Sequence, residues 1–219
     1  MTDANALNRR FVVLISGQGS NLQQIVTEAQ AGQWPLEVVR VISNRADAPG
    51  LAWAQAQGLP TAVVCHHDYD SRQDFDDALA KVIEKDRPDY VLLAGFMRIL
   101  TAGFVAQFKS RLINIHPSLL PAFTGLNTHA RALEAGVGWH GCTVHFVTES
   151  LDHGPIIAQA ALAVDRSASV QTLAERVLRL EHMIYPRVVQ WLAQGRVRLD
   201  ESNQVHIQGV AQPHIWSQL

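Results

Sequence analysis

The sequence lacks a surplus of charge of either sign. Its 219 residues include 18 Lys and Arg against 20 Asp and Glu, so the formal net charge is −2. Proteins that bind the nucleic-acid backbone or an anionic membrane surface usually carry a clear positive excess. The composition therefore argues against nucleic acid or a membrane as a partner. Small anionic ligands, held by local sites, are the better expectation.

Long apolar runs and cysteines are also scarce. No stretch approaches the roughly 18 apolar residues of a membrane-spanning helix, and residues 1–10 contain no apolar run typical of a secretory signal. The two cysteines, Cys65 and Cys142, are too few and too distant in sequence to indicate a disulfide framework. We expect a cytoplasmic protein with free thiols.

The sequence does contain a regular alternation of β-branched runs and helical stretches. With 47% hydrophobic residues, the chain can bury one substantial core. Strands that alternate with helices predict a parallel sheet with right-handed crossovers. The expected strands are residues 11–15, 38–42, 61–65, 90–94 and 111–116, and the expected helices are residues 22–31, 46–57, 71–85 and 101–107.

The pattern changes after Pro117. Residues 118–125 contain too many Pro and Gly for a regular element. A helix is expected over 128–135, a pair of added strands over 142–147 and 155–164, a long helix over 171–193 interrupted near Pro186, and then a small hairpin. The predicted fold is α/β: a Rossmann-like, mostly parallel sheet with helices on both faces and antiparallel additions in the C-terminal half. Residues 10–199 should form a single domain, and residues 200–219 a tail or hairpin extension.

A glycine-containing loop joins the first expected strand to the first expected helix. Gly17 and Gly19 would let backbone N–H groups approach an anion, and the helix N-terminus adds to the attraction. Ser20 and Gln23 fit a capping box. The loop predicts a phosphate site, although two glycines can also make a tight turn without a ligand. Leu22 occupies the third glycine position of a dinucleotide fingerprint, which disfavours NAD.

Asn114 and His116 lie two residues apart at the end of the fifth expected strand. Side chains at i and i+2 of a strand share a face, and open α/β sheets bind ligands at the carboxyl ends of their strands. Asp152 lies in a later turn-forming segment, and it could fold back on the imidazole and favour its charged form. Each of the three also has a structural interpretation, as a polar group satisfied by backbone or as a turn residue.

Histidine and cysteine occur together in two further segments, residues 65–67 and 140–145. Neither segment has the ligand spacing of a zinc site, and adjacent strand residues point to opposite faces. We therefore expect no metal.

Five motifs occur in the order found in one enzyme family. They are SGQGSNL (16–22), LAGFMRIL (93–100), NIHPSLLP (114–121), HGCTVHFV (140–147) and LDHGPII (151–157). Together they resemble the folate-dependent phosphoribosylglycinamide formyltransferase family over residues 10–199, which would then be one formyltransferase catalytic domain. The resemblance implies transfer of the formyl group of 10-formyltetrahydrofolate, as co-substrate, to the amine of phosphoribosylglycinamide in de novo purine biosynthesis. It implies no metal and a monomer or homodimer.

The resemblance also implies roles for individual residues. The catalytic residues would be Asn114, His116 and Asp152; the residues in contact with phosphoribosylglycinamide would be Gly19, Ser20, Asn21 and Glu181; and the residues that hold the folate would be Arg72, Met97, Arg98, Ile99, Leu100 and Asn114. Four positions depart from the family pattern, namely Ala122, Thr124, Asn127 and His153, and all lie in loops expected to line the site.

The chemistry fits these residues. An amine that attacks a formyl carbon places negative charge on oxygen, which needs preorganised donors. Asn114 and protonated His116 could supply them, and His116 could pass a proton to the departing folate nitrogen.

Three alternatives stay open. Formyltetrahydrofolate hydrolase shares the catalytic trio but has an extra domain before it, whereas the first strand is expected here at residue 11. Methionyl-tRNA formyltransferase needs an additional C-terminal domain for tRNA. A non-catalytic sugar-phosphate or folate binder would not need the trio together.

Overall fold

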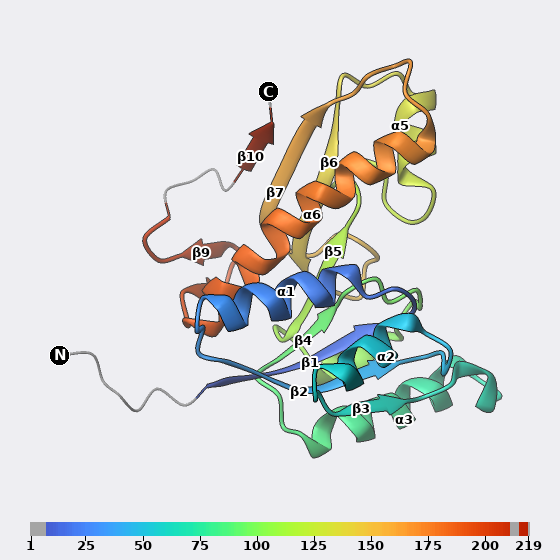
Figure 1. The fold of residues 1–219 in the computed structure, drawn as a ribbon, viewed down its shortest axis with the longest axis vertical. Coiled ribbons are helices and arrows are strands. Elements are labelled where there is room, and N and C mark those ends of the chain that lie inside the picture. Colours follow the sequence, from blue (N-terminus) through green and yellow to red (C-terminus); the bar gives the residue numbers. More distant parts are fainter. Residues whose placement is uncertain (1–7, 211–214, 219) are drawn as a thin grey trace.

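The first strand, β1 (Arg9–Ile15), is buried on both faces, which is typical of a central strand in a parallel sheet. Its odd-numbered residues from Phe11 onward pack into one hydrophobic core with α1 (Ser20–Ala31), α2 (Pro49–Ala56) and α6 (Val170–Ala193). Val12 and Leu14 pack into a second core with α3 (Arg72–Lys85) and α4 (Ala102–Gln107). Helices thus cover both faces of the sheet, as predicted, with α1 and α6 side by side on one of them (Figure 1).

The computed structural model describes residues 8–210 and 215–218, and in them the main sheet has eight strands in the order β10-β7-β6-β5-β4-β1-β2-β3. The strands that pair in parallel from β5 to β3 are β5 (Leu112–His116), β4 (Tyr90–Leu93), β1, β2 (Leu36–Ser43) and β3 (Thr61–Val63). β6 (Trp139–Phe146) is antiparallel both to β5 and to β7 (Ile156–Ala163). The predicted mostly parallel sheet with antiparallel additions is confirmed.

The strand order places a topological switch beside β1. The chain runs from β1 outward to β2 and β3, and then returns to add β4 and β5 on the other side of β1. Sheets of this kind open a crevice at the carboxyl ends of the strands where the direction reverses. Here these ends are the loops that follow β1 and β4.

Two short helices and a hairpin complete the described residues. The 3₁₀ turn η1 (His66–Asp68) follows β3, and α5 (Thr128–Glu134) precedes β6. The predicted hairpin is present as β8 (Val197–Leu199) and β9 (Val205–Ile207), and two of its residues join the first core. Beyond it β10 (Ile215–Gln218) pairs in parallel with β7, which was not predicted. Residues 1–7, 211–214 and 219 lie outside the described residues, and so does part of the predicted tail.

Two local predictions are wrong. Helix α6 continues through Pro186 without interruption, because buried neighbours such as Tyr185 and Val188 hold both halves of it in the core despite the lost hydrogen bond. The predicted capping box at α1 does not form: Gly19, in the left-handed region, is the N-cap, and the Gln23 side chain donates instead to the Gln18 carbonyl. Among the described helices, none is both long and apolar enough to cross a membrane.

Candidate active site

A pocket of about 500 Å³ occupies the crevice at the carboxyl ends of β1 and β4. Its floor is the loop between β1 and α1, where Gly19 has φ 68 and an added Cβ would come within 3.2 Å of the Gly50 Cα. A side chain at this position would thus be both strained and crowded. The loop and the start of α1 line the pocket, and backbone N–H groups at a helix N-terminus can form an anion site. Gly19, Ser20 and Asn21, predicted to bind the substrate phosphate, all line the pocket.

The predicted substrate residue Glu181 lies on α6, 160 positions after Asn21, and lines the same pocket. Asn21 Nδ2 donates a hydrogen bond of 2.8 Å to Glu181 Oε2. Burial raises the pKa of Glu181 to about 7, and the hydrogen bond from Asn21 opposes this shift only in part. Asn21 Oδ1 is buried without a partner. Asn21 Oδ1 is therefore available to accept a hydrogen bond from a hydroxyl group of a ligand.

The loop after β4 closes the opposite wall. Ser16, at the end of β1, accepts a hydrogen bond of 2.8 Å from the Met97 backbone N–H and donates one of 2.6 Å to Asn44 Oδ1. Met97 and Arg98 line the pocket. Of the other residues predicted to hold folate, Ile99 is 54% exposed and follows directly, whereas Arg72 lies at the start of α3, and the structure does not bring it into the pocket.

The three residues predicted to be catalytic come together at the end of β5, the strand next to β4. His116 Nδ1 lies 3.5 Å from Asp152 Oδ2, and both side chains are less than 10% exposed. Asp152 has φ 55. Asn114 faces the same region, where its Nδ2 lies 3.3 Å from His145 Nε2. The expectation that Asp152 folds back on His116 is confirmed.

His145 is the member of this cluster that the sequence interpretation missed. It lies on β6 directly opposite Asn114 in the antiparallel ladder, and its Nε2 is 3.9 Å from Asp152 Oδ1. Its Nδ1–H donates to the Phe146 carbonyl at 2.8 Å, so Nε2 is free to accept from Asn114. Burial lowers the pKa of His145, although the Phe146 carbonyl and Asp152 oppose the shift. A neutral His145 thus fixes the orientation of the Asn114 amide.

The loop between β5 and α5 covers the cluster with backbone groups. The second ring nitrogen of His116, Nε2, donates to the Phe123 carbonyl at 3.0 Å. The Gly125 N–H donates to Asp152 Oδ2 at 2.8 Å. Both ring nitrogens of His116 thus face an oxygen acceptor, namely Asp152 Oδ2 for Nδ1 and the Phe123 carbonyl for Nε2. Asp152 Oδ2 is held in turn by the Gly125 N–H.

The four positions that depart from the family pattern do lie in loops around the cluster. Ala122 and Thr124 flank Phe123, and Asn127 adopts φ 57 as the N-cap of α5. His153 is exposed, and its Nδ1–H donates to the Leu151 carbonyl at 2.6 Å. Although His153 follows Asp152 in sequence, its ring is bonded within its own loop.

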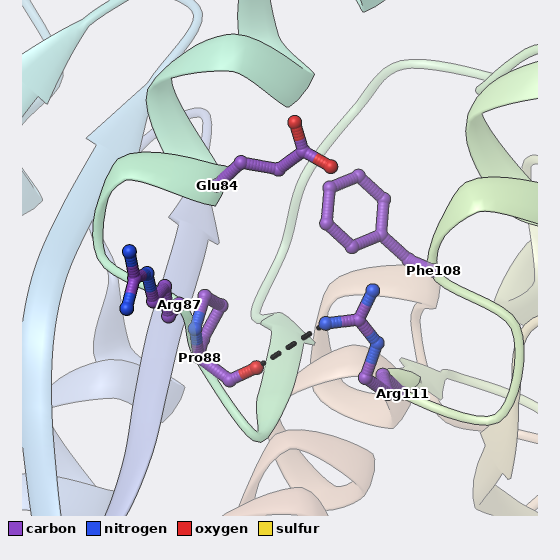
Figure 2. Close-up of a pocket in the computed structure, with 5 residues that line it drawn as sticks. All are labelled: Glu84, Arg87, Pro88, Phe108 and Arg111. Carbon is purple, nitrogen blue, oxygen red and sulfur yellow. Dashed lines mark hydrogen bonds between the residues drawn. The ribbon is translucent and has the colours of Figure 1, made fainter.

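A second pocket, of about 300 Å³, is lined by the residues drawn in Figure 2. It lies at the amino ends of β4 and β5, on the opposite edge of the sheet. Its lining includes Arg87 and Arg111, and Arg111 donates to the Pro88 carbonyl at 3.4 Å. None of the residues predicted to be functional lines it. Within residues 8–210 and 215–218, no group of three or more His, Cys, Asp or Glu side chains converges as a metal site would.

Comparison with known proteins decides the family. The model of the formyl transferase family matches residues 9–189, which is most of the chain. The chain belongs to the formyl transferase family. This formyl transferase is 47% identical over 192 residues to the phosphoribosylglycinamide formyltransferase of Escherichia coli K12, which covers 88% of the chain and 91% of the relative. The trifunctional purine biosynthetic protein adenosine-3 of Bos taurus is also 47% identical, but the chain spans only 19% of its length.

Solved structures agree with this assignment. The phosphoribosylglycinamide formyltransferase of Coxiella burnetii superimposes on this formyl transferase with a TM-score of 0.88 at 48% identity, covering 95% of this chain and 99% of that one. A formyltetrahydrofolate deformylase from Pseudomonas syringae gives a TM-score of 0.84 at 25% identity, and the match covers 66% of that chain. The fold is thus shared with both activities, whereas the sequence is nearer to the transferase.

Proposed function

We propose that this formyl transferase moves the formyl group of 10-formyltetrahydrofolate to the amine of phosphoribosylglycinamide, giving formylphosphoribosylglycinamide and tetrahydrofolate in de novo purine biosynthesis. The observation that carries the proposal is the cluster at the end of β5, where His116 lies 3.5 Å from Asp152 and His145 lies between Asp152 and Asn114. The pocket with the glycine loop lies two strands away on the same edge of the sheet. The names of two relatives that are 47% and 48% identical to the chain, each covered over more than 90% of its length, support the same substrate.

The lining of the pocket offers groups that suit the proposed substrate. The phosphate binds to backbone N–H groups of Gly19, Ser20 and Asn21, and the sugar hydroxyls donate to Glu181 and to the unpartnered Asn21 oxygen. The folate lies against Met97, Arg98, Ile99 and Leu100, and Arg72 at the start of α3 is a contact for its more distant part. Only β4 separates β1 from β5 in the sheet. A substrate whose phosphate is bound at the glycine loop can therefore extend past the end of β4, so that its amine lies near the trio.

The trio supplies the chemistry. As the amine attacks, the formyl oxygen gains negative charge, and the amide of Asn114 and the Nε2–H of His116 donate to it, the latter in a bond that it shares with the Phe123 carbonyl. Asp152 stabilises the imidazolium from the Nδ1 side. Collapse of the tetrahedral species breaks the bond between the formyl carbon and the folate N10, which keeps the electron pair and takes the proton of His116 Nε2. The neutral imidazole then accepts the proton that the attacking nitrogen gives up.

The test is an assay of the purified chain with 10-formyltetrahydrofolate, in the presence and absence of phosphoribosylglycinamide. Release of tetrahydrofolate that depends on the amine supports the proposal. Release without the amine would make the protein a hydrolase, and no release in either case would make it a binder. We also propose a cytoplasmic monomer or homodimer that binds neither nucleic acid nor a membrane, which sedimentation and cell fractionation would test.

A further inference from the structure

One short backbone segment, residues 123–127, binds both His116 and Asp152, the pair called the catalytic dyad below. The Phe123 carbonyl accepts from His116 Nε2 at 3.0 Å, and the Gly125 N–H donates to Asp152 Oδ2 at 2.8 Å. An imidazole with a partner at each ring nitrogen cannot rotate freely, and a carboxylate fixed by an N–H keeps one oxygen turned toward it. The position of this segment therefore sets the geometry of the dyad.

The segment does not hold its own shape as a helix or strand would. Three of its five residues, Phe123, Gly125 and Asn127, have φ of 54, 75 and 57, in the left-handed region. Gly and Asn adopt this region readily, but for Phe it is clearly less favourable than the right-handed one. Contacts from outside the segment must therefore keep it in place.

Arg131, on α5, makes three such contacts. Its Nη1 donates to the Thr124 carbonyl and, at 3.4 Å, to the Leu126 carbonyl. Its Cζ lies 5.6 Å from the centroid of the Phe123 ring, an arrangement typical of a cation–π contact. The guanidinium thus grips the backbone on both sides of Gly125 and the side chain of Phe123, although Arg131 is itself exposed.

We propose that Arg131 is a positioning residue for the reaction, which acts by fixing residues 123–127 against His116 and Asp152. The inference rests on the proposed formyl transfer. Arg131 touches neither member of the dyad in any hydrogen bond of the structure's described part, so its effect passes through the Phe123 carbonyl and the Gly125 N–H. Its task is orientation, and its loss should lower turnover more than substrate affinity.

The first test compares Arg131→Gln with Arg131→Lys. Arg131→Gln should lower kcat about tenfold, because a small misplacement of catalytic groups is costly, with KM for both substrates and the unfolding midpoint almost unchanged. Lys keeps the positive charge and can still donate hydrogen bonds, so it should restore part of the loss. A matched control is Arg166→Gln, since exposed Arg166 also donates to a backbone carbonyl, that of Gly136 at the far end of α5. It should leave kcat unchanged; an equal loss in this control, or an unchanged kcat in Arg131→Gln, would overturn the inference.

A double-mutant cycle separates positioning from a general structural role. In an Asp152→Asn background the dyad is already broken, so adding Arg131→Gln should cost little more. A full tenfold further loss would contradict the proposed route.

Hydrogen exchange of the Gly125 amide, followed by NMR in the folded protein, provides a readout that does not need activity. Arg131→Gln should speed this exchange while Arg166→Gln should not, whether or not the wild-type protein transfers formyl groups. Unchanged exchange would refute the positioning role alone, and an inactive wild-type protein with faster exchange in Arg131→Gln would refute only the proposed function.

Discussion

Replacing Glu181 by Gln should make the protein more stable above neutral pH. Glu181 lies in the middle of α6, is only 9% exposed, and has a pKa that burial raises from 4.5 to about 7. The unfolded chain therefore releases this proton near pH 4.5, whereas the folded protein keeps it to about pH 7. The free energy of unfolding should thus fall as pH rises through this window and level off above it.

The magnitude follows from the width of the window. A shift of about 2.5 pKa units, at 1.36 kcal/mol for each, corresponds to about 3 kcal/mol, most of which develops between pH 5 and pH 8. Gln cannot ionise, and its carbonyl oxygen can still accept the hydrogen bond from Asn21 Nδ2. The free energy of unfolding of the variant should therefore equal that of the wild type at acid pH and be about 3 kcal/mol larger above pH 7.

Urea unfolding at a series of pH values from 5 to 8 measures this difference. The control is Glu175→Gln, an exposed carboxylate on the same helix, bonded to Gln171, whose curve should parallel that of the wild type. If the free energy of unfolding of Glu181→Gln also changed with pH in parallel with that of the wild type, burial would not raise the pKa of Glu181 and the reasoning would fail.

Four further substitutions probe the cluster and the core. His116→Ala and Asp152→Asn should each lower kcat by about 10²- to 10³-fold with the fold retained; near-normal kcat in either would disprove the mechanism, and circular dichroism checks the fold. Tyr185→Phe should lower the free energy of unfolding by about 1 kcal/mol in urea, because its buried hydroxyl donates at 3.2 Å to carbonyls of both β4 and β5; equal stability would show that the bonds contribute nothing. In Gly154→Ala the new Cβ would lie 1.7 Å from the Phe146 carbonyl oxygen, so both the unfolding midpoint and kcat should fall, and normal kcat would mean that the Asp152 loop is held differently.

Much of this structure could be predicted because its cause is local. Residues 11–15 are short, rich in β-branched side chains and soon followed by glycine, so both the parallel sheet and the position of the glycine loop could be predicted from the sequence. The alternation of polar and apolar residues at 113–116 placed Asn114 and His116 on one face, and the structure agrees.

What could not be predicted depends on partners far away in the sequence. His145 joins the cluster only because β6 pairs antiparallel with β5 in a register that sets it opposite Asn114, and register is decided by the whole sheet. The raised pKa of Glu181 arises from packing around α6 and carries no local signature. Pro186 shows the converse, since a strong local breaker is overruled by the burial of its neighbours.

The residue at position 152 must meet two separate requirements, a left-handed backbone conformation and a negative charge. At φ 55, Asp and Asn are among the few residues other than Gly that sit comfortably, while others incur a penalty of about 1–2 kcal/mol. Alanine would remove the carboxylate and strain the turn together, whereas asparagine removes the charge alone. Glutamate would keep a carboxylate at this position, but its backbone would be strained in the left-handed conformation. The position is thus open to very few residues for reasons of shape, and among them only aspartate also carries the charge.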